Sequence, residues 1–276
     1  MKLLVTTSKA LIVVDYNGAD SKVEILHEGR GAYYGVTELE GNYFVTARDD
    51  KLPRTMVTSE NGVLLKFDGN FNYVGESSPD HFNMRGLHGV VSWKGSIVCA
   101  ITHSDCLGVF DGKTWGSWQS IEKVRPDDPD NYHINTLVVK DDVLLQLSKS
   151  VFDSTLDCIN EYSELYGPSI KTHEPYGTYT HDIWFEDGAI WSIEFQSSSV
   201  VSNRGDRIKL DQGLTRGITI TDDSYYVGVS APSHRQSRHN TTGKILRFDK
   251  NWVLLDQYVM ESGGQVHEIK PYTVSK

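Results

Sequence analysis

The chain has 276 residues, 38% of them apolar, and a net charge of −10. This length and composition can bury a large core, and the acidic total without basic runs argues against a nucleic-acid-binding protein. No apolar run approaches the ~20 residues of a membrane span, and the opening segment is too short for a signal peptide. We therefore expect a cytoplasmic protein with no membrane partner. The cysteines Cys99, Cys106 and Cys158 have no C-x-x-C spacing, which predicts reduced thiols.

The N-terminus contains three short apolar segments, at residues 3–6, 10–14 and 23–26, that have the composition of β-strands. From residue 34 on, one phrase recurs: a single residue, a short apolar strand, a tight turn rich in Gly or Asp, and a second strand. The phrase begins at Tyr34, His88, His133, His181, Arg216 and, in a final incomplete copy, His267. The mean period, near 46 residues, divides the chain into six. This repeat predicts an all-β fold, a six-bladed β-propeller with four strands per blade.

The two ends of the chain are complementary in this pattern. Only one strand follows His267, whereas three strands precede Tyr34. We predict that residues 265–270 form an innermost strand that pairs with residues 3–7 and closes the ring, removing exposed sheet edges. Residues 1–276 then form one propeller domain.

Helical periodicity is weak throughout the chain. The best candidate is Asp157–Tyr166, where Ile159, Tyr162 and Leu165 are spaced for one helical face. We expect at most one or two helical turns in this connection.

In a propeller the innermost strands begin beside the central channel, so the six repeat starts should gather around one opening. Four of these six residues are histidines, whereas ten histidines in 276 residues predict about 0.2 at six random positions. The turn signals define the same frame without the histidines. We expect a histidine-rich axial site.

Such a site suits two kinds of chemistry. Histidines 88, 133, 181 and 267 could hold a divalent metal, with Fe, Mn, Zn and Ca not distinguished. Alternatively, the imidazoles and a guanidinium could bind an oxyanion, with His133 and His181 as catalytic acid, base or nucleophile. Asn135, two residues after His133, would face the same side and contact a ligand. A third interpretation is that these polar groups only hold ordered water.

Basic residues in the long connections favour an anionic small-molecule ligand, because a local cationic rim attracts anions. The rim candidates are Arg48, Arg54, Lys149, Arg235, Arg238 and His239. Among them Arg48, Lys149 and Arg235, together with Tyr34 and Asn135, are candidate substrate-binding residues. Arg216 is the candidate anion clamp, since its planar guanidinium suits bidentate capture of carboxylate, sulfate or phosphate. An ion pair of Arg216 with Asp182 or Glu268 would instead indicate a structural role.

The segment His133-Ile134-Asn135-Thr136, with Lys149 ending the next strand, resembles a blade of the arylsulfotransferase-like propellers. In that family a His-x-Asn-Ser phrase and a basic residue bind sulfate, and one channel histidine carries the sulfuryl group. Here Thr136 replaces the serine, and Lys149 stands where an arginine would be expected. The segment from Thr215 to His239 also resembles a blade of uncharacterised bacterial propeller proteins. The resemblance implies a propeller whose axial histidines and cations bind an anion.

Two functions follow from these observations. The first is an enzyme, a transferase, lyase or hydrolase, that acts on an anionic small molecule at the mouth of the channel. The second is a non-catalytic ligand-binding or protein-interaction propeller. A metal or an oxyanion held by the histidines would separate them.

Overall fold

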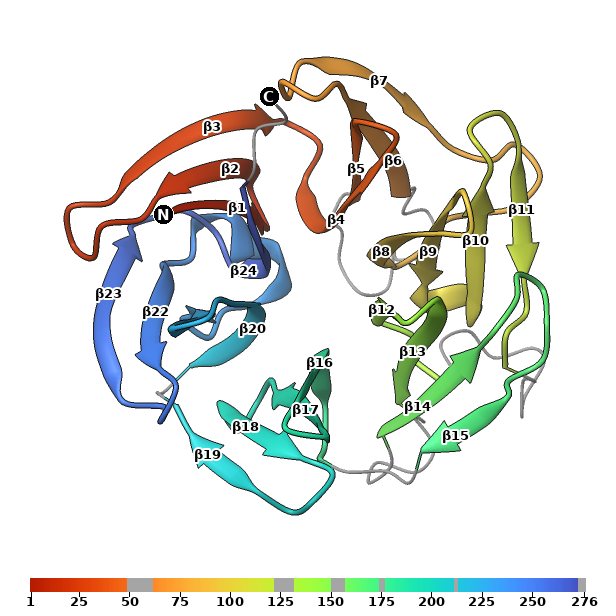
Figure 1. The fold of residues 1–276 in the computed structure, drawn as a ribbon. Helices are drawn as coiled ribbons and strands as arrows, with labels where there is room; N and C mark the ends of the chain where they lie inside the picture. The colour runs from red at the N-terminus through yellow and green to blue at the C-terminus, as the bar shows by residue number, and fades with distance from the viewer. Residues whose placement is uncertain (49–61, 122–131, 150–156, 174–176, 211–212, 273–276) are drawn as a thin grey trace.

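The computed structural model describes residues 1–48, 62–121, 132–149, 157–173, 177–210 and 213–272, apart from the side chains of Arg235 and Gln236. The described strands form six four-stranded antiparallel sheets, which stand as blades around a common axis (Figure 1). The chain is therefore an all-β, six-bladed propeller, as the repeat predicts. No described helix is long and apolar enough to cross a membrane.

From the axis outwards, blade 1 consists of β24 (Val266–Pro271), β1 (Lys2–Thr7), β2 (Ala10–Asp15) and β3 (Lys22–Glu28). Blade 2 consists of β4 (Ala32–Leu39), β5 (Asn42–Arg48), β6 (Gly62–Phe67) and β7 (Tyr73–Ser77). Blade 3 consists of β8 (Leu87–Trp93), β9 (Ser96–Ile101), β10 (Cys106–Phe110) and β11 (Trp115–Trp118).

Blade 4 consists of β12 (Thr136–Lys140), β13 (Val143–Lys149), β14 (Asp157–Tyr162) and β15 (Lys171–His173). Blade 5 consists of β16 (Thr180–Glu186), β17 (Ala189–Glu194), β18 (Ser199–Ser202) and β19 (Arg207–Lys209). Blade 6 consists of β20 (Leu214–Ile220), β21 (Ser224–Ser230), β22 (Gly243–Asp249) and β23 (Leu254–Met260). Short 3₁₀ helices lie at η2 (Thr102–Ser104) and η3 (Arg235–Asn240).

The predicted closure of the ring is confirmed. Strand β24 pairs with β1 in the register Leu4 with Lys270 and Val5 with Ile269, and the two strands lie side by side in the ring (Figure 1). The C-terminal strand is thus the innermost strand of the blade whose other three strands are N-terminal. This arrangement covers the free edge of β1.

Tight turns join the first two strands of most blades, as the Gly and Asp signals predict. The turn Glu40-Gly41 has two positive φ angles, 51° and 73°, and the turns after β8, β12 and β16 share this geometry. Turns of this kind match the right-handed twist of the strands they connect, so they fix the hairpin register. The sequence frame used for the repeat therefore rests on real hairpins.

The core lies between the blades in six apolar clusters, and each cluster is shared by two neighbouring blades. Alternation along the strands produces it: Leu3 and Val5 face blade 6, whereas Leu4, between them, faces blade 2. Side chains on a strand point alternately to its two faces, and both faces of a blade are covered. This explains why the inner strands are apolar without interruption.

The helical prediction for Asp157–Tyr166 is wrong, because Asp157–Tyr162 is strand β14. It pairs with β13 over its whole length, and Ile159 and Tyr162 are both buried. In the blade, pairing with β13 satisfies the backbone N–H and C=O groups of this segment. The sequence could not show this, because short apolar runs have too little periodicity to distinguish a helix from a strand. Tertiary context decides here.

Candidate functional site

The repeat starts of five blades converge at the axis because their inner strands are irregular at the same place. The pairing register shifts between Tyr33 and Val36 in blade 2, between Leu87 and Val90 in blade 3, and between His181 and Ile183 in blade 5. Blades 1 and 6 have comparable shifts. A β-bulge bends its strand and re-aims a side chain. In this propeller the bulges turn the repeat-start side chains towards the axis.

A cavity of about 40 Å³ lies where these side chains meet. Its lining includes Tyr34, His88, Asn135, His181, Asp182, Arg216, His267 and Glu268. Five of the six repeat starts line the cavity, together with Asn135. The sixth repeat start, His133, does not line it. The volume admits roughly three water-sized groups. It suits the head group of a ligand rather than a large substrate.

The aromatic residues form a continuous row beside this cavity. The ring of Tyr34 stacks on His267 at a centroid distance of 4.2 Å and lies 4.6 Å from His88. His133 precedes β12 instead of lying on it, has φ 44°, and packs its ring against His88 at 5.7 Å. His133 is therefore next to the cavity through His88.

Backbone carbonyls orient two of the histidines. Nδ1 of His88 donates to the Gly86 carbonyl over 2.8 Å, and Nδ1 of His267 donates to the Tyr33 carbonyl over 2.8 Å. These bonds fix the tautomer and leave the lone pair on Nε2. Both rings also line the shared cavity. The carbonyls therefore orient both rings, and both rings still line the cavity.

His181 and Arg216 form a pair at the cavity. Nη2 of Arg216 donates to Nε2 of His181 over 3.1 Å, so this imidazole is neutral and carries its proton on Nδ1. The guanidinium lies 4.3 Å from the centroid of the Phe195 ring, which also contacts His181 edge-on. Phe195, which the sequence analysis missed, follows β17 and supports the face of the guanidinium.

Electrostatics keep the imidazoles of His88 and His181 uncharged. Burial, followed by the positive charge of Arg48, holds the pKa of His88 well below its ordinary value. Burial and the charge of Arg216 do the same to the pKa of His181. Burial also lowers the pKa of Arg216, to about 10, which leaves the guanidinium protonated at neutral pH. The site therefore combines neutral imidazoles with permanent positive charge.

The other predicted cations lie around this centre with different roles. Nη2 of Arg48, at the end of β5, donates to the Tyr34 hydroxyl over 2.8 Å, and the guanidinium lies over the Tyr34 ring. Lys149, at the end of β13, is buried with Nζ against the Tyr179 ring and does not line the cavity. The side chain of Arg235 and the whole of Arg54 lie outside the described residues.

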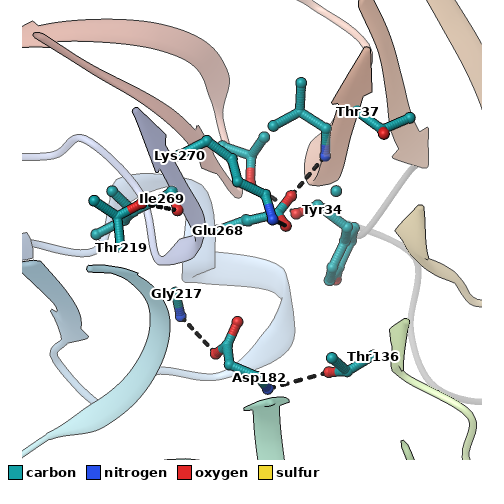
Figure 2. Close-up of polar contacts among 12 residues, drawn as sticks. Tyr34, Thr37, Thr136, Asp182, Gly217, Thr219, Glu268, Ile269 and Lys270 are labelled. Carbon is teal, nitrogen blue, oxygen red and sulfur yellow. Dashed lines mark hydrogen bonds and ion pairs between the residues drawn. The ribbon is translucent and has the colours of Figure 1, made fainter. Parts of the chain in front are cut away.

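Two carboxylates of the lining were anticipated only as ion-pair partners for Arg216. Figure 2 shows that they bind backbone groups of neighbouring blades instead: Oδ2 of Asp182 accepts from Gly217 N at 2.9 Å, and Oε2 of Glu268 accepts from Val36 N at 2.6 Å. Glu268 also pairs with Lys270 at 3.0 Å. Among the described residues, Arg216 forms no ion pair with either carboxylate.

A signal for both acidic residues is present in the repeat. The residue after the repeat start is glycine at Gly35, Gly89 and Gly217, whereas it is Asp182 in blade 5 and Glu268 in blade 1. The glycines allow close approach of inner strands, since a Cβ at Gly89 would lie 2.8 Å from the Asn135 carbonyl oxygen. Acidic residues at an otherwise glycine position mark a local departure from the repeat.

The geometry gives no support to the predicted four-histidine metal site. Within the described residues, no three His, Cys, Asp or Glu side chains are arranged to hold a metal ion. The orientation of the histidines gives a physical reason: the His181 lone pair accepts from Arg216, and His133 lies behind His88. The guanidinium charges nearby also oppose a cation.

Comparison with solved structures identifies propellers over nearly the whole chain. A chain of the nidogen/laminin complex superposes with a TM-score of 0.67 at 9% identity, covering 97% of both chains. A Bacteroides caccae protein of unknown function gives 0.63 at 11% identity, with 97% of both chains covered. The periplasmic gluconolactonase of Pseudomonas aeruginosa gives 0.57 at 12% identity, with 99% of both covered. These likenesses show the fold alone. No protein-family model matches the chain, and no curated protein sequence matches it.

Proposed function

We propose that the axial cavity binds the acidic group of a small anionic molecule and that Arg216 holds this group. The observation that carries the proposal is the environment of the guanidinium, which contacts a neutral imidazole and an aromatic ring but no described carboxylate. Desolvating a charge without a partner is costly, and an anion offsets that cost. A carboxylate or another oxyanion can accept two parallel N–H bonds from a guanidinium.

The charges around the cavity favour an anion over a metal. Arg48 and Arg216 both act on His88, where they disfavour a second positive charge. The same repulsion opposes a divalent cation and attracts an anion. In addition, Nε of Arg216 is buried with no described hydrogen-bond partner, so the guanidinium retains donor capacity for a ligand after small adjustment.

In the catalytic form of this proposal, His181 and His133 supply acid–base chemistry at the bound molecule. His181 lines the cavity and bears its lone pair on Nε2, so it can accept a proton from a ligand that replaces the Arg216 donor. His133 is one ring removed, against His88. A binding module would use the same anion contact without proton transfer, so binding is the property to test first.

The test is a titration of the purified protein with acetate, sulfate and phosphate at low ionic strength, followed by ligand-observed or protein-observed NMR. We expect at least one anion to bind, and Arg216→Gln to weaken it by about 30-fold or more, the scale of ~2 kcal/mol or greater for losing one partner of a desolvated charge pair. Arg216→Lys should retain part of the affinity because it keeps charge but loses the planar fork.

The exposed Arg204 provides the matched control, since Arg204→Gln removes the same charge at a distant turn. Equal affinity in wild type and Arg216→Gln would contradict the proposal. Elemental analysis of protein purified without added metal gives a second contradiction: a stoichiometric metal that disappears in His88→Ala and His181→Ala would assign these imidazoles to a cation.

A further inference from the structure

The axial cavity has two chemically different sides. Arg216 and His181 contribute a cationic donor and an imidazole, whereas β16 and β24 contribute the carboxylates of Asp182 and Glu268 to the same lining. A simple carboxylate or inorganic anion would use only the first side. The second side requires hydrogen-bond donors from whatever occupies the cavity.

Asp182 is the carboxylate with an unused oxygen. Its Oδ2 accepts from Gly217 N, and among the described residues its Oδ1 makes no hydrogen bond or ion pair. Figure 2 shows this second oxygen directed away from Gly217. Both oxygens of Glu268 are engaged, one with Val36 N and one with Lys270. The acceptor available to a ligand is therefore Oδ1 of Asp182.

The backbone at Asp182 adds an independent observation. Asp182 has φ 57° in the bulge of β16, in the left-handed region that disfavours residues with a Cβ. Blades 2, 3 and 6 have glycine at this position, so the fold accommodates glycine here without loss of the bulge. Asp141 and Asp187 have similar φ angles in hairpin turns, but Asp182 lines the cavity.

A second acceptor lies on the same lining. Nδ2 of Asn135 donates to the Thr180 carbonyl, and Oδ1 of Asn135 is buried without a hydrogen-bond partner among the described residues. Buried acceptors without a donor are unfavourable, and native proteins rarely leave them so. Asn135 and Asp182 together give the cavity two acceptors for ligand donors.

The charge balance separates a hydroxyl from an ammonium group. Glu268 and Lys270 neutralise each other. This leaves one negative charge, on Asp182, against the positive charges of Arg216 and Arg48, which act on each other and on His88. The remaining charge is positive. A ligand with net negative charge is favoured over a zwitterion, so the donor group is a hydroxyl.

Building on the anion site proposed above, we propose that the ligand is a small hydroxy acid, or carries one as its head group, with its carboxylate on Arg216 and its hydroxyl on Asp182 Oδ1. The volume of about 40 Å³ limits the part inside the cavity to a few heavy atoms. Glycolate is the smallest probe with both groups, and acetate lacks only the hydroxyl.

The experiment compares acetate, glycolate and glycine by NMR titration at pH 7.5, where Asp182, whose pKa burial raises to about 6, is ionised. We expect glycolate to bind about 10- to 100-fold more tightly than acetate, the range for a hydrogen bond to a charged group. In Asp182→Asn the glycolate preference should fall to a few-fold, and acetate should bind at least as tightly as in the wild type, because a negative charge in the cavity lining is removed. This variant keeps an acceptor for Gly217 N, so a folding defect is not expected.

Asp182→Gly should also abolish the preference for glycolate, because it removes the carboxylate. Other blades have glycine at this position, so we expect this variant to fold. Asp187→Asn is the matched control: Asp187 has φ 51° but lies in the exposed turn of the same blade. Equal affinities for acetate and glycolate in the wild type would overturn this inference and leave the anion site standing. Failure of both acids to bind would overturn the anion site itself, and tighter binding of glycine than glycolate would overturn the hydroxyl assignment.

Discussion

At the scale of single residues, a hydrogen bond to one ring nitrogen orients each of three axial histidines. His88 and His267 donate to backbone carbonyls, and His181 accepts from Arg216. Each ring is thereby oriented and, for His88 and His181, kept neutral by burial and nearby positive charge, which lower the pKa. Neutral, oriented imidazoles beside a guanidinium can donate or accept hydrogen bonds without adding charge.

Because His88 is neutral in the folded protein, the stability of the fold depends on pH. The folded pKa of His88 lies below the unfolded value of about 6.5, so the unfolded chain takes up a proton that the folded protein excludes. The contribution of the neutral imidazole to the free energy of unfolding is fully present above about pH 6.5. It decreases as the pH falls, with a slope approaching about 1.4 kcal/mol per pH unit for one such imidazole. Denaturant unfolding of wild type and His88→Gln at pH 8, 7 and 6 measures it. The variant should lose less stability on acidification; parallel losses would contradict the assignment.

The titration of Asp182 changes stability with pH in the opposite direction. Burial raises its folded pKa to about 6 from the ordinary 3.8, so its contribution to stability is present below about pH 4 and is lost as the pH rises through 6. Asp182→Asn removes this titration. Above pH 7 we therefore expect the variant to be at least as stable as the wild type in urea unfolding, by up to about 2 kcal/mol. Marked destabilisation at pH 8 would show that the charged form is required by the fold.

At the scale of elements, buried hydroxyls on or just after the second strands of four blades join each of these blades to the next. Thr6 donates to the Tyr34 carbonyl at 2.8 Å, Thr46 to the His88 carbonyl at 2.6 Å and Thr102 to the Ile134 carbonyl at 2.5 Å. In blade 6, Ser230 accepts from Val266 N at 2.9 Å. These bonds end on the irregular starts of the inner strands, so they hold the bulges that position the site.

Thr46→Val tests this coupling with little change in volume. The substitution removes the donor to His88 and the acceptor for Gly35 N, leaving buried backbone groups unsatisfied. We expect a loss of about 1–3 kcal/mol in the free energy of unfolding, measured by urea denaturation. We also expect weaker anion binding, because the bulge carrying His88 relaxes. An unchanged urea midpoint would show that water replaces the hydroxyl.

At the scale of the whole molecule, the ring depends on one strand from the far end of the chain. Truncation after Gln265 removes β24, which leaves β1 with an open edge and exposes the core shared with blade 6. We expect loss of cooperative thermal unfolding and aggregation in size-exclusion chromatography. Truncation after Tyr272 keeps β24 and is the control. A monomeric, cooperatively unfolding protein without β24 would show that closure contributes little to stability.

The repeat, the number of blades, the closure of the ring and the gathering of five of the six repeat starts around the cavity were predictable from the sequence alone. These features depend on hairpin turns such as Glu40-Gly41 and on alternating burial such as Leu3, Leu4 and Val5, which are local patterns. A further local signal went unused: a buried hydroxyl follows an apolar residue at Val5-Thr6, Val45-Thr46, Ile101-Thr102, Leu147-Ser148 and Val229-Ser230.

The contacts that the axial residues make with one another depend on how the blades pack. The partner of Arg216 is the imidazole of His181 from the neighbouring blade, and the unused oxygen of Asp182 depends on Gly217 binding the other one. Strand β14 likewise became a strand through its pairing with β13. The chain order of residues carries no information on distances between blades, because bulges and packing between blades fix those distances. Residue identities therefore predict where a site lies, while its chemistry depends on contacts between residues far apart in the chain.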